Sequence, residues 1–96
     1  MSVLIISKWD ADAGISEDIY QRMTDEMGTR DTLPTGGEQH LFGGSSADGY
    51  VIAEIWASEE AFGAFAQATL GPASHKLGCP PPSSVTVLPL VRQLAG

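Results

Sequence analysis

The sequence predicts an α+β fold with the element order β-α-β-β-α-β, in which two helices cover one face of a four-stranded antiparallel sheet. Three observations indicate it: short β-branched and apolar runs recur along the chain, two amphipathic segments separate them, and the middle two runs are joined by a short turn. This order is the split ferredoxin-like arrangement. Ninety-six residues suffice for one hydrophobic core, so we expect a single domain over residues 1–96.

The beginning of the chain supplies the first strand and the first helix. The segment 3–9, VLIISKW, is rich in β-branched and aromatic residues and too short for a confident helix. After a polar turn at 10–14, apolar residues recur at every fourth position, which predicts a helix that buries one stripe: Ile15, Ile19, Met23 and Met27. Gly28 suits the end of this helix.

A β-hairpin is expected in the middle of the chain. The segment 29–38 contains a proline and a glycine pair and predicts a loop. The strands 38–44 and 50–56 then flank SSADG at 45–49, which has the composition of a turn. A connection this short favours direct antiparallel pairing of the two strands.

The second helix begins after the hairpin. Ser58 is a favourable N-cap, because its hydroxyl can accept a hydrogen bond from a backbone N–H of the first turn. We expect Gly71-Pro72 to interrupt this helix, with a second short helical segment at 73–77. The loop 78–84 holds three consecutive prolines, and the run 85–91 predicts the last strand.

Composition excludes several classes of partner. Twelve acidic residues against five basic ones give a net charge of −7, which argues against nucleic acid or an anionic membrane as the partner. The single cysteine, Cys79, cannot form an internal disulfide and fits a reducing compartment. The sequence contains no signal-peptide pattern and no apolar run long enough to span a membrane, so we expect a cytoplasmic protein.

Both faces of the predicted sheet are apolar. In the first strand, Leu4 and Ile6 alternate with Val3 and Ile5, and the third strand shows the same lack of a polar face. An antiparallel sheet with helices on one side normally has a solvated polar face on the other. We therefore expect a homodimer in which the open sheet face of one copy packs against that of the second.

The stretch DGYVIAEIWASEEAFGAFAQATLGP at 48–72 resembles the third strand and second helix of the dimeric α+β barrel superfamily, the small bacterial proteins related to antibiotic biosynthesis monooxygenases. The resemblance rests on a strand that ends in Trp56, on Ser58-Glu59-Glu60-Ala61-Phe62, on Phe65 and on Leu70-Gly71-Pro72. It implies a ferredoxin-like protomer and a dimeric α+β barrel. The superfamily hosts unrelated functions, so the resemblance does not fix the activity.

The resemblance also suggests what to expect of cofactors. Haem-degrading members use an asparagine near the end of the first strand, a tryptophan on the second helix and a later histidine that ligates iron. The matching positions here hold Ser7, Phe65 and His75, so only the histidine is retained. We expect no cofactor, with haem held through His75 as the disfavoured alternative. Cyclase members use a histidine base beside a tyrosine, which His75 with Tyr20 or Tyr50 would imitate.

Two histidines are the candidate catalytic residues. His40 and His75 carry the side chain that titrates near neutral pH, although each has an ordinary structural alternative as a packed or exposed histidine. They are far apart in the sequence without a clear third ligand, so we expect no metal site. Glu54 is unusual in an apolar strand and needs either solvent or a basic partner, for which Lys8 is a candidate.

Four aromatic residues are candidates for binding a hydrophobic small molecule, and each also suits a packing role: Trp9, Tyr20, Trp56 and Phe65. Together with the histidines they suggest a cofactor-independent monooxygenase-like enzyme for an aromatic or polyketide-type substrate. Two alternatives stay open. One is a cyclase or isomerase that uses a histidine base, and the other is a non-catalytic ligand-binding or stress-associated dimer.

Overall fold

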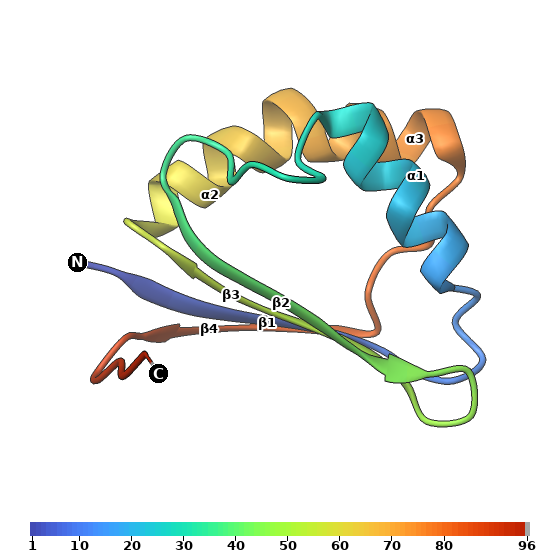
Figure 1. Cartoon of the computed structure of the whole chain (residues 1–96), viewed down its shortest axis with the longest axis horizontal. Coiled ribbons are helices and arrows are strands. Elements are labelled where there is room, and N and C mark those ends of the chain that lie inside the picture. Colours follow the sequence, from blue (N-terminus) through green and yellow to red (C-terminus); the bar gives the residue numbers. More distant parts are fainter. Residues whose placement is uncertain (96) are drawn as a thin grey trace.

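The computed structural model describes residues 1–95 and confirms the predicted order of elements, with all helices on one face of the sheet (Figure 1). The sheet order is β2-β3-β1-β4, and all three pairings are antiparallel. The elements are β1 (Val3–Trp9), α1 (Glu17–Met27), β2 (Gly37–Ser45), β3 (Gly49–Trp56), α2 (Glu59–Phe65), the π-helical turn η1 (Ala66–Leu70), α3 (Gly71–Leu77) and β4 (Ser84–Pro89).

Strand β1 lies in the centre of the sheet and shows which face the helices cover. Ile5, Ser7 and Trp9 are buried, whereas the alternating Ile6 is half-buried and Lys8 is exposed. Because side chains alternate between the faces of a strand, the first set points toward the helices. The register with β3 then assigns the even-numbered side chains of that strand to the same face.

Both long helices begin at serine caps. The Ser16 hydroxyl accepts a hydrogen bond from the Ile19 N–H, so α1 begins two residues later than the apolar repeat suggested. Gly28 ends α1 in the left-handed conformation, as predicted. Ser58 caps α2 through a bond from the Ala61 N–H, which confirms the predicted start.

The predicted interruption at Gly71-Pro72 is wrong. The backbone stays helical from Glu59 to Leu77, and the turn before the proline widens into a π-helix, in which the Gly71 N–H bonds to the Ala66 carbonyl. Proline lacks an N–H, and its ring clashes with the carbonyl four residues earlier in a regular α-helix. The wider turn admits Pro72 without ending the helix.

The core is centred on Trp56 at the end of β3. Its side chain is 1% exposed, the lowest value among the large buried residues apart from Ile5. The indole packs edge-on against Phe62 with ring centroids 5.4 Å apart, and against Phe65 at 5.3 Å. Trp56 therefore joins the sheet to α2.

The opposite sheet face carries exposed apolar side chains and no helix within residues 1–95 (Figure 1). Leu41 is 58% exposed, Leu88 45% and Val51 36%. The pairings Leu41↔Ala53 and Leu4↔Leu88 place them on one surface, because directly opposed residues of antiparallel strands point the same way. No helix among the described residues is long and apolar enough to cross a membrane.

Two adjacent glycines in β2 give a matched test of the hairpin geometry. Gly44 has φ +137°, and a Cβ there would collide with the Gly49 carbonyl and lie 2.7 Å from the Tyr50 Cα, whereas a Cβ at Gly43 meets nothing within 4 Å. We expect Gly44→Ala to lower the free energy of unfolding by about 1–3 kcal/mol and Gly43→Ala to change it by less than about 0.5 kcal/mol. Urea denaturation measures both, and equal effects would contradict the described hairpin.

Candidate functional site

A cavity of about 760 Å³ lies between the sheet and the helices. Its volume falls in the range of sites that bind small organic ligands. Strands β1 and β3 form the floor, α1 and the helical stretch 59–77 form the walls, and residues 29–34 and 79–82 lie at the rim. Much of the lining is apolar, including Ile15, Met23, Met27, Ile52, Phe62 and Leu70.

The hairpin register brings His40 and Glu54 together on the cavity floor. The turn pairs Ser45 with Gly49, and counting back along both strands places His40 directly opposite Glu54. His40 Nδ1 lies 2.8 Å from Glu54 Oε2, and the two side chains are 28% and 15% exposed. Glu54 therefore has a basic partner, as expected, but this partner is His40 and not the candidate Lys8, which points away from the helices.

Tyr20 reaches the same histidine from helix α1. Its hydroxyl oxygen lies 2.6 Å from His40 Nε2. The phenol ring stacks on Phe42 of β2 with centroids 3.8 Å apart and planes 2° from parallel, which fixes its orientation. Burial, and then the negative charge of Glu54, raise the pKa of Tyr20 above its ordinary value of 10.0. The phenol therefore keeps its proton at neutral pH.

The Glu54 carboxylate determines the tautomer of a neutral His40. Because a carboxylate only accepts hydrogen bonds, the imidazole proton is on Nδ1 and is donated to Glu54, and Nε2 then accepts from the Tyr20 O–H. The three residues form one hydrogen-bonded chain that lines the cavity. A carboxylate that accepts from Nδ1–H also stabilises the imidazolium that forms when Nε2 takes up a proton. We call this chain the Tyr20–His40–Glu54 relay.

The other predicted site residues divide into two groups. Trp9 and Phe65 line the cavity, and the Trp9 indole is held by a 2.9 Å bond from Nε1–H to the Pro80 carbonyl. Trp56 is not in the lining, and the structure places it in the core. His75 is exposed in the last turn of α3 and also lies outside the lining, away from His40.

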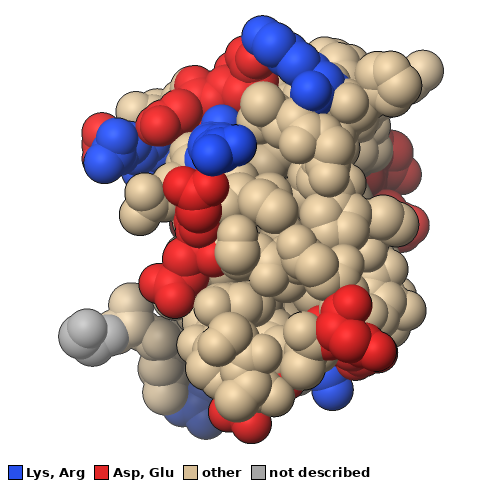
Figure 2. All heavy atoms as spheres, turned by 90° about the vertical axis from the view of Figure 1, so that its right-hand side faces the viewer, with Lys and Arg blue, Asp and Glu red and all other residues tan. Residues whose placement is uncertain are grey.

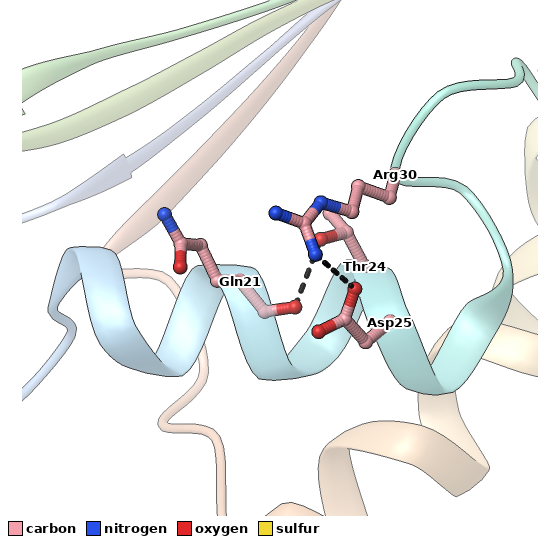
Figure 3. Close-up of polar contacts among 4 residues, drawn as sticks. All are labelled: Gln21, Thr24, Asp25 and Arg30. Atoms are coloured by element: carbon pink, nitrogen blue, oxygen red, sulfur yellow. Dashed lines mark hydrogen bonds and ion pairs between the residues drawn. The ribbon is translucent and has the colours of Figure 1, made fainter.

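One cationic side chain stands at the rim of the cavity. The Arg30 guanidinium lies alongside α1, 3.5 Å from an Asp25 oxygen, while the Thr24 hydroxyl donates to the Gln21 carbonyl at 2.9 Å (Figure 3). Both Arg30 and Thr24 line the cavity, and neither was identified as a site residue from the sequence.

Figure 2 shows acidic groups at the edges of one face of the molecule, with broad uncharged surface between them.

Neither a cluster of metal-ligating side chains nor the histidine expected to bind haem iron lies at this cavity within residues 1–95. No group of three histidine, cysteine, aspartate or glutamate side chains in residues 1–95 is arranged to hold a metal ion. His75, the residue that the haem-degrading pattern would use as iron ligand, does not line the cavity. The placement of His75 therefore does not fit haem bound between the sheet and the helices.

Solved structures share this fold. A candidate antibiotic biosynthesis monooxygenase from Chloroflexus aurantiacus is 17% identical, with 100% of both chains covered and a TM-score of 0.68. A variant of SnoaB, a cofactor-independent oxygenase from Streptomyces nogalater, is 16% identical, with 99% of this chain and 98% of that chain covered and a TM-score of 0.65. The haem degrader MhuD from Mycobacterium tuberculosis, solved with two haems in its active site, is 20% identical, with coverages of 99% and 100% and a TM-score of 0.58.

The fold can be described at two levels of detail. The sheet order and the helices on one face define a ferredoxin-like α+β domain. More narrowly, the chain shares its fold with a candidate antibiotic biosynthesis monooxygenase and a cofactor-independent oxygenase, which is the fold that the resemblance led us to expect. No family model matches the sequence, and neither does any curated protein. At these identities, the likeness establishes the fold alone.

Proposed function

We propose that this protein is a cofactor-independent, monooxygenase-like enzyme that deprotonates an aromatic or polyketide-type substrate in the cavity. The observation that carries the proposal is the Tyr20–His40–Glu54 relay on the wall of an apolar cavity of about 760 Å³. A base supported by a carboxylate, within a site that excludes much water, is suited to removing a proton from a weak carbon acid. The apolar lining selects a flat, hydrophobic substrate.

The relay moves one proton away from the substrate. The Tyr20 oxygen accepts the C–H proton while its own O–H proton passes to His40 Nε2, and Glu54 stabilises the imidazolium. Tyr20 is then the residue that touches the substrate, and its new O–H donates a hydrogen bond to the enolate. The raised pKa of Tyr20 favours this concerted transfer, because a free tyrosinate is disfavoured in this position.

In the oxygenase reaction, molecular oxygen is the second substrate. The carbanion transfers an electron to O₂, and recombination forms a C–O bond to a peroxide, which takes the proton held on His40. Loss of the remaining C–H proton and cleavage of the O–O bond give a carbonyl group and water. The sum is CH₂ + O₂ → C=O + H₂O, in which the carbon is oxidised and oxygen is reduced.

A cyclase or isomerase is the second candidate, and the same relay supports it. Such a reaction needs only the enolate and its stabilisation by the Tyr20 O–H, with the proton returned from His40 at another carbon. It consumes no oxygen. A ligand-binding protein without catalysis would use the cavity and leave the relay idle.

Anthrone and a linear polyketone distinguish these functions. For the oxygenase, anthrone is expected to be converted to anthraquinone with one O₂ consumed per molecule, and the rate should vanish under nitrogen. For the cyclase, the polyketone reacts at the same rate with and without oxygen. Binding of both compounds with no rate above that in buffer would overturn both catalytic proposals.

We further propose that two copies form a homodimer through the open sheet face defined by Leu41, Val51 and Leu88. Light scattering is expected to give twice the 10.1 kDa mass of one chain at micromolar concentration. Leu41→Glu should weaken the dimer at least about 100-fold, since it buries a charge between the sheets. Leu33→Glu is the control, because Leu33 is similarly exposed but lies at the cavity rim. A monomeric wild-type protein would contradict the proposal.

The location of the protein is a separate inference. The chain has a single cysteine, Cys79, and burial raises the pKa of its thiol, so it stays an unreactive thiol at neutral pH. We infer that the protein works in a reducing compartment such as the cytoplasm. Equal activity with and without a reducing agent would agree with this inference.

A further inference from the structure

Ser7 is a buried polar residue of the cavity that the relay does not use. It lies on the helix-facing side of β1, is 9% exposed and lines the cavity. Its hydroxyl has no hydrogen-bond partner among residues 1–95. Every fully enclosed polar side-chain atom in these residues does have a partner, so the unpaired Ser7 oxygen is not fully enclosed. The Ser7 oxygen therefore borders the open space of the cavity.

Thr24, the other buried polar residue of the lining, and the indole of Trp9 are already satisfied within the protein. The Trp9 N–H donates to the Pro80 carbonyl, and the Thr24 hydroxyl donates to the Gln21 carbonyl. The members of the relay bond to one another. A buried hydroxyl without a partner costs free energy that an alanine in the same place would not. The hydroxyl of Ser7 is thus the buried polar group that is free to form a hydrogen bond with a ligand in the cavity.

The sheet register fixes where Ser7 lies relative to the relay. Ser7 is paired with Ile52 of β3, and Glu54 is two residues further along that strand on the same face. His40 lies one strand beyond Glu54. Two strand spacings and an offset of two residues along the strands, roughly 12 Å in all, therefore separate Ser7 from His40 across the floor, with the apolar Ile52 between them. A flat molecule lying on Ile52 can meet polar groups at two opposite edges.

We propose that the Ser7 hydroxyl donates a hydrogen bond to a carbonyl or phenolate oxygen of the ligand, on the edge remote from Tyr20. This makes Ser7 a specificity-determining residue for fused-ring aromatic ligands that carry an oxygen on that edge. The inference rests on the proposed function for the aromatic class of ligand, and it narrows that class. Anthrone meets both ends of the cavity with its CH₂ group at Tyr20 and its carbonyl group at Ser7, whereas an unsubstituted hydrocarbon offers Ser7 no acceptor.

Binding measurements with three probes, made under nitrogen so that anthrone is not oxidised, test the inference. Anthraquinone carries oxygen at two opposite edges of its fused rings, anthrone at one edge, and anthracene carries none. Quenching of Trp9 fluorescence reports their binding, because this indole lines the cavity while Trp56 does not. The wild-type protein is expected to bind anthraquinone about tenfold more tightly than anthracene, the gain of about one hydrogen bond.

Two serine-to-alanine variants make the test specific. Ser7→Ala should weaken anthraquinone binding about fivefold to tenfold and leave anthracene unchanged. Ser84→Ala is the matched control, since Ser84 pairs with Lys8 and lies on the other face of the sheet. It should leave all three affinities unchanged. Thermal unfolding by circular dichroism verifies that both variants fold like the wild type.

The outcomes separate this inference from the proposed function. Unchanged anthraquinone affinity in Ser7→Ala, or an equal loss for anthracene, overturns the role of Ser7 even if anthrone is turned over. Ser7-dependent selectivity without any turnover overturns the catalytic proposal and supports the binding site. Failure of all three probes to bind overturns both.

Discussion

Replacing His40 by alanine is expected to reduce turnover by about 10²-fold to 10⁴-fold, the usual contribution of a general base. The substitution removes the group that accepts the proton from Tyr20 and leaves Glu54 without its partner at 2.8 Å. The fold should persist, since the His40 side chain is 28% exposed and lies on the edge strand β2. Initial rates of anthrone or polyketone turnover measure the loss, alongside a thermal unfolding curve.

Two conservative variants show whether the three residues act as one relay. Tyr20→Phe removes only the hydroxyl and keeps the ring stacked on Phe42. It should lose nearly as much activity as His40→Ala, because no other group among the described residues links His40 to the substrate in the proposed mechanism. Combining it with His40→Ala should cost little more than either change alone, since residues that act as a unit are not additive.

His75→Ala provides the matched control for the histidine substitution. His75 is exposed on α3 and does not line the cavity. We expect its removal to change turnover less than about twofold, in keeping with surface substitutions remote from a site. A large loss in His75→Ala with an unaffected His40→Ala would reverse the assignment of the base and refute the relay.

Replacing Trp56 by alanine is expected to have the largest effect on stability, a loss of about 3–5 kcal/mol in the free energy of unfolding. The indole is 1% exposed and packs against both Phe62 and Phe65, so its removal opens a void where the sheet meets α2. A domain of this size is stable by only about 5–15 kcal/mol. The urea midpoint should therefore fall by at least about a fifth of the wild-type value.

The size of the side chain, and not its chemistry, should determine this loss. Trp56→Phe keeps part of the contact with Phe62 and should cost clearly less than Trp56→Ala. Leu94→Ala, at a site that is 80% exposed, is expected to change stability by less than about 0.5 kcal/mol. A Trp56→Ala protein with a near-normal midpoint would mean that the junction of β3 and α2 is not the centre of the core.

The fold was predictable because its signals are local. The apolar repeat of α1, the cap at Ser58 and the turn before Gly49 each act within a few residues. The error at Pro72 has another origin: the turn before it widens into a π-helix, which helix propensity does not anticipate. Local rules identify a helix breaker but not the neighbouring structure that tolerates it.

The site was only partly predictable for the same reason. The pairing of His40 with Glu54 follows from the hairpin, since counting back from the turn places them opposite each other, and that count was the missed signal. The bond from Tyr20 depends on how α1 lies over the sheet, and no short-range pattern determines this. Ser7 likewise becomes noticeable only once its neighbours are known to leave its hydroxyl unpaired.

The relay combines two residues of the sheet with one residue of a helix, and this affects how the protein loses activity as it begins to unfold. His40 and Glu54 belong to one hairpin and are held in register by the backbone, whereas Tyr20 arrives on a helix across the cavity. An ion pair between Glu26, in the last turn of α1, and Lys76 connects the C-terminal end of this helix to α3. Partial detachment of this helix would break the contact at His40 while the sheet stays native. Loss of activity would then precede global unfolding, and the tyrosine would act as a sensor of helix docking.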